Sequence, residues 1–126
     1  MPNEASISIV DDDESFREAM TGLMKSLGYL VASFVSAEEF LASDAADHSA
    51  CLIADMQMTG LSGLALYEHL VASGKSIPTI LVTAFPNEKA RARALQRGVL
   101  CYLEKPFSEN ELLTCIQSAM DSKTGN

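Results

Sequence analysis

Long apolar runs are absent from this sequence. No stretch approaches the roughly 20 residues that a membrane-spanning helix requires. Residues 1–4 also lack the basic start and the apolar segment of a secretory signal peptide. We therefore expect neither a membrane span nor export, and we expect a cytoplasmic protein.

Basic residues are scarce. Nine Lys and Arg stand against 17 Asp and Glu, which gives a formal net charge of −8. A surface of this charge repels the phosphates of nucleic acids. The nearest approach to a basic cluster lies within 89–97, where the basic residues are spread around one expected helix. We therefore expect no direct binding to nucleic acid.

Cysteine is sparse as well. The three copies, Cys51, Cys101 and Cys115, form no CxxC pair and lie within apolar or helical patterns. Their simplest interpretation is as small buried or half-buried hydrophobic residues. The spacing predicts neither a disulfide nor a zinc site.

Hydrophobic residues, in contrast, make up 48% of the 126 residues, which is enough for the core of one domain. Strand-like runs alternate with helix-like stripes. The expected strands are 6–10, 29–34, 50–54, 79–82 and 99–103; the expected helices are 14–27, a short helix after Ser36, 62–73, 87–97 and 108–120. The strands are mostly continuous apolar runs, as when both faces are covered. This pattern predicts an α/β fold with an open parallel sheet and helices on both sides.

Reactive side chains stand at the carboxyl ends of four of these strands. They are Asp11 and Asp12 at the first, Asp55 at the third, Thr83 at the fourth and Lys105 at the fifth. Open α/β sheets bind their ligands at this edge. We therefore expect these side chains to meet and form a site.

The chemistry of this set favours phosphoryl transfer. Three carboxylates placed together repel one another, and one lysine cannot balance them, whereas Mg²⁺ binds carboxylates and phosphate oxygens well. Lys105 would supply a compact positive charge for a phosphoryl oxygen, and Thr83 would supply a hydroxyl donor. Such groups stabilise the charge of a phosphoryl group. Asp55 remains as a carboxylate nucleophile.

Four motifs together resemble the receiver domain of bacterial two-component response regulators. The motifs are Ile9-Val10-Asp11-Asp12, Asp55 before Met58-Thr59-Gly60 and Gly63, Val82-Thr83-Ala84, and Lys105-Pro106-Phe107. The resemblance covers residues 5–122 and leaves 123–126 as a tail or the start of a linker. It implies a flavodoxin-like sheet with strand order 2-1-3-4-5. Segments 36–41 and 104–107 are most similar to the FixJ-type regulators.

The resemblance also implies a role for each site residue. Asp55 would accept a phosphoryl group from the phosphohistidine of a sensor histidine kinase. Mg²⁺ would be bound by Asp11, Asp12, Asp55 and the backbone carbonyl of Gln57. Thr83 would hydrogen-bond to the phosphoryl group. The domain would catalyse only its own phosphorylation and dephosphorylation, so it would not be an enzyme acting on other substrates.

A conformational switch is implied as well. Lys105 would pair with the phosphoryl group, and the Lys105–Pro106 bond would be cis. Tyr102 would turn inward when Thr83 moves. The surface of the fourth helix, fifth strand and fifth helix would then change its affinity for an output domain, a downstream protein or a second copy of the chain.

One position departs from the family pattern. Thr59 stands where the family usually has proline, a residue that stiffens a loop by fixing φ. This departure puts the rigidity of the loop in doubt. Gln57 and Phe85 flank the expected path of hydrolytic water, and we expect them to tune the lifetime of the phosphoryl group.

Three alternatives remain open at this point. The segment Asp11-Asp12-Asp13 also fits a haloacid-dehalogenase-like phosphatase, with Asp11 as nucleophile and Asp13 as acid, but that assignment leaves Asp55 without a role. A flavodoxin-like binding module would need a phosphate loop where the three aspartates stand. A receiver that signals without phosphorylation would usually lack a site residue. For Asp13, capping of the first helix is the preferred interpretation.

Overall fold

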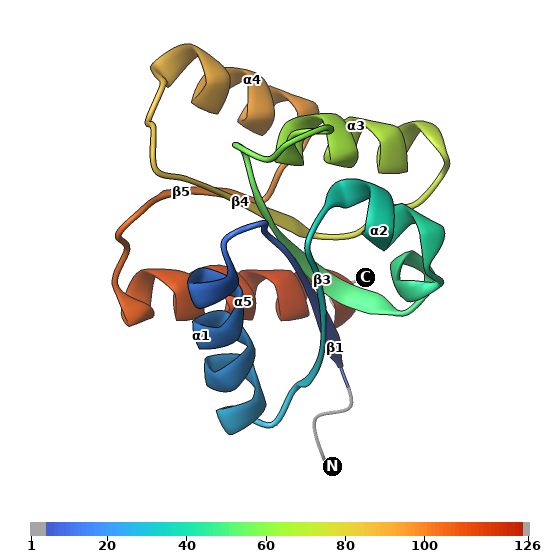
Figure 1. Cartoon of the computed structure of the whole chain (residues 1–126), viewed down its shortest axis with the longest axis vertical. Helices are drawn as coiled ribbons and strands as arrows, with labels where there is room; N and C mark the ends of the chain where they lie inside the picture. The colour runs from blue at the N-terminus through green and yellow to red at the C-terminus, as the bar shows by residue number, and fades with distance from the viewer. Residues whose placement is uncertain (1–4, 125–126) are drawn as a thin grey trace.

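The computed structural model describes residues 5–124 as a five-stranded sheet flanked by helices (Figure 1). Residues 1–4, whose composition argued against a signal peptide, and 125–126 of the expected tail lie outside the described residues. The strands are β1 (Ser6–Val10), β2 (Leu30–Phe34), β3 (Ser49–Asp55), β4 (Thr79–Thr83) and β5 (Cys101–Glu104). The helices are α1 (Glu14–Ser26), α2 (Ala37–Ala42), the 3₁₀ helix η1 (Ala45–Asp47), α3 (Gly63–Ala72), α4 (Glu88–Arg97) and α5 (Glu109–Thr124).

All strand pairs are parallel, and the strand order is β2-β1-β3-β4-β5. Helices α1 and α5 cover one face of the sheet, and α2, α3 and α4 cover the other (Figure 1). The expected α/β class, the strand order 2-1-3-4-5 and the flavodoxin-like arrangement are therefore confirmed. Within residues 5–124, none of the helices combines the length and the apolar character needed to cross a bilayer.

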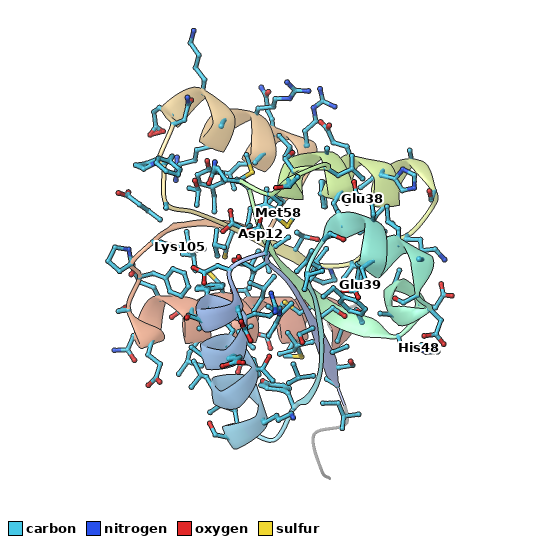
Figure 2. The ribbon with its side chains drawn as sticks, in the orientation of Figure 1. Asp12, Glu38, Glu39, His48, Met58 and Lys105 are labelled. Carbon is cyan, nitrogen blue, oxygen red and sulfur yellow. The ribbon has the colours of Figure 1, made fainter. Side chains whose placement is uncertain are left out.

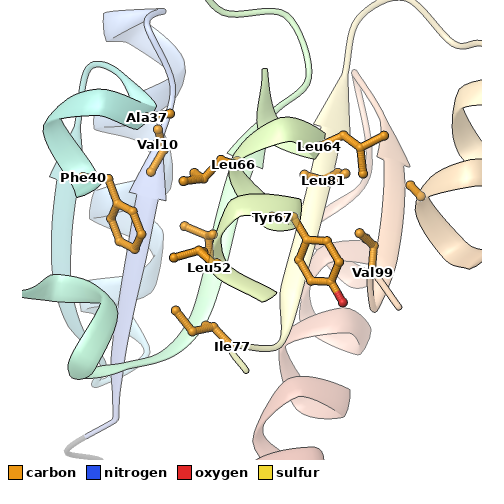
Figure 3. Close-up of a cluster of buried hydrophobic side chains, with 13 residues drawn as sticks. Val10, Ala37, Phe40, Leu52, Leu64, Leu66, Tyr67, Ile77, Leu81 and Val99 are labelled. Carbon is orange, nitrogen blue, oxygen red and sulfur yellow. The ribbon is translucent and has the colours of Figure 1, made fainter. Parts of the chain in front are cut away.

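Each face of the sheet buries its own hydrophobic cluster. In β3, Leu52 and Ala54 point toward α2, α3 and α4, and Cys51 and Ile53 point toward α1 and α5. All four side chains are fully buried, which explains the continuous apolar run in the sequence. Figure 3 shows the first cluster, in which Leu52 packs among side chains from the helices on that face.

The register brings the carboxyl ends of the strands to one edge. Val10 pairs with Ala54, Asp55 pairs with Val82, and Thr83 pairs with Glu104. The residues that end or directly follow these strands therefore lie side by side. This edge carries the candidate site.

Short polar side chains fix the helix boundaries, as their spacing predicts. Asp13 caps α1 by accepting hydrogen bonds from the backbone N–H groups of Ser15 and Phe16. Ser108 and Glu111 form a reciprocal capping box at the start of α5, with both distances near 3.0 Å. These caps satisfy N–H groups that a helix would otherwise leave without partners.

Two boundaries differ from the sequence-based expectation by more than one residue. Strand β5 begins at Cys101 rather than at Val99, because the Val99 N–H donates to the carbonyl of Ala94 and so completes the end of α4. Helix α5 continues to Thr124 instead of fraying after 120, and a hydrogen bond from Gln117 to Asp121 supports this extension. The short helix η1 was not predicted.

Candidate functional site

The ammonium of Lys105 lies between two buried carboxylates at the carboxyl edge of the sheet. Its Nζ atom is 2.6 Å from Asp55 Oδ2 and 3.2 Å from Asp11 Oδ2. Asp11 is 1% exposed and Asp55 is 5% exposed. Asp55 ends β3, Asp11 follows β1 and Lys105 follows β5, so three strands contribute to this one cluster. The structure thus brings three of the five side chains that were expected to meet at this edge into direct contact.

Burial raises the pKa of Asp11 to about 6, and the neighbouring charge of Asp55 contributes to the rise. The backbone N–H of Asp13, 2.8 Å from Asp11 Oδ1, and the Lys105 ammonium act in the opposite direction. Burial is the largest cause of this rise, and two carboxylates against one ammonium also leave the cluster with a net negative charge. The site therefore favours additional positive charge.

Lys105 has one contact that the sequence motifs did not indicate. Its Nζ atom lies 4.0 Å from the centre of the Phe16 ring, within the range of a cation–π interaction. Phe16 in turn meets Phe107 edge-on, with ring centres 6.1 Å apart. Burial alone would lower the pKa of Lys105, but its hydrogen bond to Asp55 and the charges of Asp11 and Asp55 raise the pKa above its ordinary value. In the sequence, Phe16 was visible only as part of an apolar helix stripe.

Asp12 is exposed at the same edge, beside the loop that follows β3 (Figure 2). Its Oδ2 atom accepts a long hydrogen bond of 3.4 Å from the backbone N–H of Thr59. Proline has no N–H group and could not make this contact. Thr59, where the family pattern has proline, thus joins the loop to Asp12.

Glu38 of α2 makes a second hydrogen bond to this loop. Its Oε2 atom accepts the Leu61 N–H at 3.1 Å. Gly60 has φ +89°, and a Cβ atom built there would lie only 2.7 Å from the same carboxylate oxygen. Glycine therefore suits this position both by its conformation and by its small volume. In the sequence, Glu38 was visible only as a residue in the first turn of an expected helix.

Gln57 contacts both Asp55 and the Thr83 side chain. Its backbone N–H donates to Asp55 Oδ1 at 2.6 Å. Its side-chain Oε1 accepts the hydroxyl hydrogen of Thr83 at 2.7 Å. Thr83 Oγ1 also accepts the N–H of Phe85 at 3.0 Å. The Thr83 hydroxyl is thus at the expected edge, but it is bonded to Gln57 rather than to the carboxylate and lysine cluster.

Tyr102 points its hydroxyl inward. The oxygen is buried and makes no hydrogen bond within the part of the chain that the structure describes. Burial raises the pKa of Tyr102, and the nearby Thr83 side chain only partly offsets this rise. The two hydroxyl groups are not in hydrogen-bond geometry. The Lys105–Pro106 peptide bond is cis, as expected.

The donor atoms at this edge suit a hard cation. Carboxylate and carbonyl oxygens are the ligands that Mg²⁺ prefers, and a Mg²⁺ site usually needs only one or two carboxylates because the ion keeps several waters. Among residues 5–124, no three His, Cys, Asp or Glu side chains converge tightly enough to form a metal cage by themselves. The raised pKa of Asp11 and the exposed position of Asp12 nevertheless fit an open site that is completed by water and phosphate oxygens.

The position of Asp13 bears on the phosphatase alternative. Its carboxylate caps α1 through the N–H groups of Ser15 and Phe16, so it is not placed as an acid beside Asp11. Asp55, which that alternative leaves without a role, is the carboxylate nearest to Lys105. The geometry therefore favours Asp55 as the reacting group.

Comparisons with known proteins agree with this geometry. The family model described as response regulator receiver domain matches residues 7–117. Nodulation protein W of Bradyrhizobium diazoefficiens is 36% identical over 118 residues, which are 94% of this chain and 52% of that protein. The chain spans about half the length of this and other curated relatives that it matches.

Solved structures show the same similarity. The response regulator StyR superposes with a TM-score of 0.89 at 34% identity, covering 97% of this chain and 62% of that chain. FixJ-N superposes with a TM-score of 0.84 at 29% identity, covering 94% of this chain and 95% of that chain. The resemblance to FixJ-type regulators is confirmed.

Proposed function

Since the chain belongs to the family of response regulator receiver domains, we propose that Asp55 accepts a phosphoryl group from the phosphohistidine of a sensor histidine kinase. The observation that carries this proposal is the Lys105 ammonium 2.6 Å from Asp55 Oδ2. In the reaction, a carboxylate oxygen of Asp55 would form a bond to phosphorus while the bond from phosphorus to the histidine nitrogen breaks. The imidazole leaves with its bonding electron pair and takes up a proton.

Lys105 and Thr83 would interact with the phosphoryl group at different stages of the reaction. Lys105 already contacts the carboxylate, and its charge would stabilise the phosphoryl oxygens during transfer. Thr83 would hydrogen-bond to the phosphoryl group after transfer, once its hydroxyl has left Gln57.

Receiver domains generally bind Mg²⁺ at the phosphorylation site. In this chain we assign the ligands to Asp11, Asp12, Asp55 and the backbone carbonyl of Gln57. When bound, the ion would supply the positive charge that Lys105 alone does not provide. The excess of negative charge where Asp11 and Asp55 meet Lys105 supports this assignment.

The surface formed by α4, β5 and α5 would respond to phosphorylation. Movement of Thr83 toward the phosphoryl group would change the surroundings of the Tyr102 hydroxyl, which lies buried beside it. This change would alter the affinity of the surface for an output domain, a downstream protein or a second copy of the chain. The domain would act as a signalling module that catalyses only its own phosphorylation and dephosphorylation, and its formal charge of −8 argues against direct contact with nucleic acid.

Incubation with phosphoramidate tests the proposal without the cognate kinase. The wild-type chain should gain one phosphoryl group in Mg²⁺ and little in EDTA, as measured by intact mass. Asp55→Asn should abolish the gain. Asp13→Asn is the matched control, because Asn also caps helices well, and it should be phosphorylated normally. Full phosphorylation of Asp55→Asn would contradict the proposal.

A further inference from the structure

The Thr83 hydroxyl has a single hydrogen, and in this structure Gln57 receives it. The distance from Thr83 Oγ1 to Gln57 Oε1 is 2.7 Å. The same hydroxyl oxygen accepts a hydrogen bond from the Phe85 N–H at 3.0 Å. A hydroxyl donates only one hydrogen bond. Thr83 therefore cannot donate to a phosphoryl group on Asp55 until its bond to Gln57 is broken.

Gln57 is also tied to the phosphoryl acceptor. Its backbone N–H donates to Asp55 Oδ1 at 2.6 Å, so one residue joins Asp55 to the Thr83 hydroxyl. Thr83 is fully buried, whereas Gln57 is exposed. The exposed amide of Gln57 can rotate into solvent and form hydrogen bonds with water instead. Gln57 is therefore the partner whose movement can break the bond to Thr83.

We propose that the Gln57 side chain is a latch that holds Thr83 in the resting state and so sets how readily the domain switches. This inference rests on the proposed function, and it adds a positioning residue that acts through Thr83. The backbone groups of Gln57 remain as they are when only its side chain is replaced. Side-chain variants therefore separate the latch from the assigned carbonyl ligand.

The latch predicts a direction for two variants. Gln57→Met keeps the length of the side chain but removes the acceptor, so the resting state loses about one net hydrogen bond. We expect the affinity for the phosphoryl mimic beryllofluoride, at saturating Mg²⁺, to increase about fivefold. Gln57→Glu keeps an acceptor and gives it a charge, which strengthens the bond to Thr83. This variant should bind beryllofluoride more weakly than wild type.

A double-mutant cycle with Thr83→Val separates the latch from a general effect on the site. Thr83→Val has no hydroxyl for Gln57 to hold. In that background Gln57→Met should change the affinity for beryllofluoride by less than about twofold. The Thr83 methyl signal of the unliganded Gln57→Met protein, followed by NMR, should also move toward its position in the beryllofluoride-bound wild type. Urea unfolding of each variant reports whether the fold is retained.

The possible outcomes distinguish the latch from the proposed function. If wild type binds no beryllofluoride, the phosphoryl-acceptor function fails. If wild type binds it and Gln57→Met binds with unchanged or weaker affinity, the function stands and the latch is wrong. An equal gain from Gln57→Met in the Thr83→Val background would also overturn the latch. If Gln57→Met does not fold, Gln57→Glu with the same cycle decides, and the absence of weaker binding would contradict the proposal.

Discussion

Lys105 lies over the face of Phe16, with its ammonium 4.0 Å from the ring centre. The lysine that approaches Asp55 is therefore positioned by an aromatic ring of α1 as well as by the two carboxylates. An aromatic face attracts a cation without neutralising it. Phe16 can thus hold Lys105 in place while leaving its charge for the phosphoryl group.

This contact predicts a measurable effect on phosphorylation. Phe16→Leu removes the ring and should slow phosphorylation by phosphoramidate by about threefold or more, because a partly exposed cation–π contact contributes about 0.5–1 kcal/mol. Phe16→Tyr keeps the ring and should react at nearly the wild-type rate. Met20→Leu, a nearly volume-conserving change on the same helix, serves as the control for the packing of α1. Equal rates for Phe16→Leu and Phe16→Tyr would argue against this role.

The buried Asp11 carboxylate predicts how stability depends on pH. Its pKa is about 6 in the folded protein against an ordinary value of 3.8, so the folded state binds the proton more tightly than the unfolded state. The resulting destabilisation is complete above pH 6 and disappears as the pH falls toward 3.8. Asp11→Asn removes this penalty but also loses a contact with Lys105. We therefore expect a net gain of only about 1 kcal/mol at pH 7.5.

Urea unfolding in EDTA measures this difference at pH 7.5 and at pH 5. The gap between Asp11→Asn and wild type should be smaller at pH 5, because wild-type Asp11 is then largely protonated. Asp13→Asn, which leaves the helix cap in place, should show no such change. A gap that stays the same at both pH values would show that Asp11 is not the cause.

The loop after β3 gives a third prediction. The Glu38 carboxylate accepts a hydrogen bond from the Leu61 N–H at 3.1 Å, so Glu38→Ala should speed amide hydrogen exchange at Leu61. Glu38→Gln should retain most of the protection against exchange, because its side chain still offers an acceptor oxygen. The neighbouring Glu39→Ala is the control, since Glu39 accepts its hydrogen bond from Val35 instead. An unchanged exchange rate at Leu61 in Glu38→Ala would mean that this hydrogen bond does not order the loop.

Gly60 gives a fourth prediction. Gly60→Ala would bring a Cβ atom within 2.7 Å of the Glu38 carboxylate and would place alanine at φ +89°. We expect the free energy of unfolding to fall by about 1–2 kcal/mol. Gly22→Ala, at a helical position where a Cβ atom meets nothing within 4 Å, should be neutral or stabilising. Urea unfolding compares the two, and equal effects would contradict the prediction.

The positions of Asp11, Asp55, Thr83 and Lys105 could be predicted because one rule decides them. Side chains at the carboxyl ends of parallel strands share an edge, whatever the details of packing. The partners of these residues could not be predicted in the same way. The Phe16 ring reaches Lys105, and Glu38 reaches Leu61, only through the way the elements carrying them pack together. These contacts depend on side-chain rotamers and helix docking, which leave no simple spacing in the sequence.

Hydrogen bonding also limited the prediction of boundaries. The apolar character of Val99 favoured a strand, but its N–H completes the last turn of α4. The expected bond from Thr83 to a phosphoryl group stays a prediction, and in this structure the hydroxyl is bonded to Gln57. In each case a single hydrogen can serve only one of two competing acceptors.

The location of the phosphoryl group tests the central claim most directly. After reaction with phosphoramidate and Mg²⁺, borohydride reduces an acyl phosphate to an alcohol, and peptide mass spectrometry then identifies the aspartate that carried it. The geometry around Lys105 predicts that the modification lies on Asp55. A modification found on Asp11 instead would contradict the account.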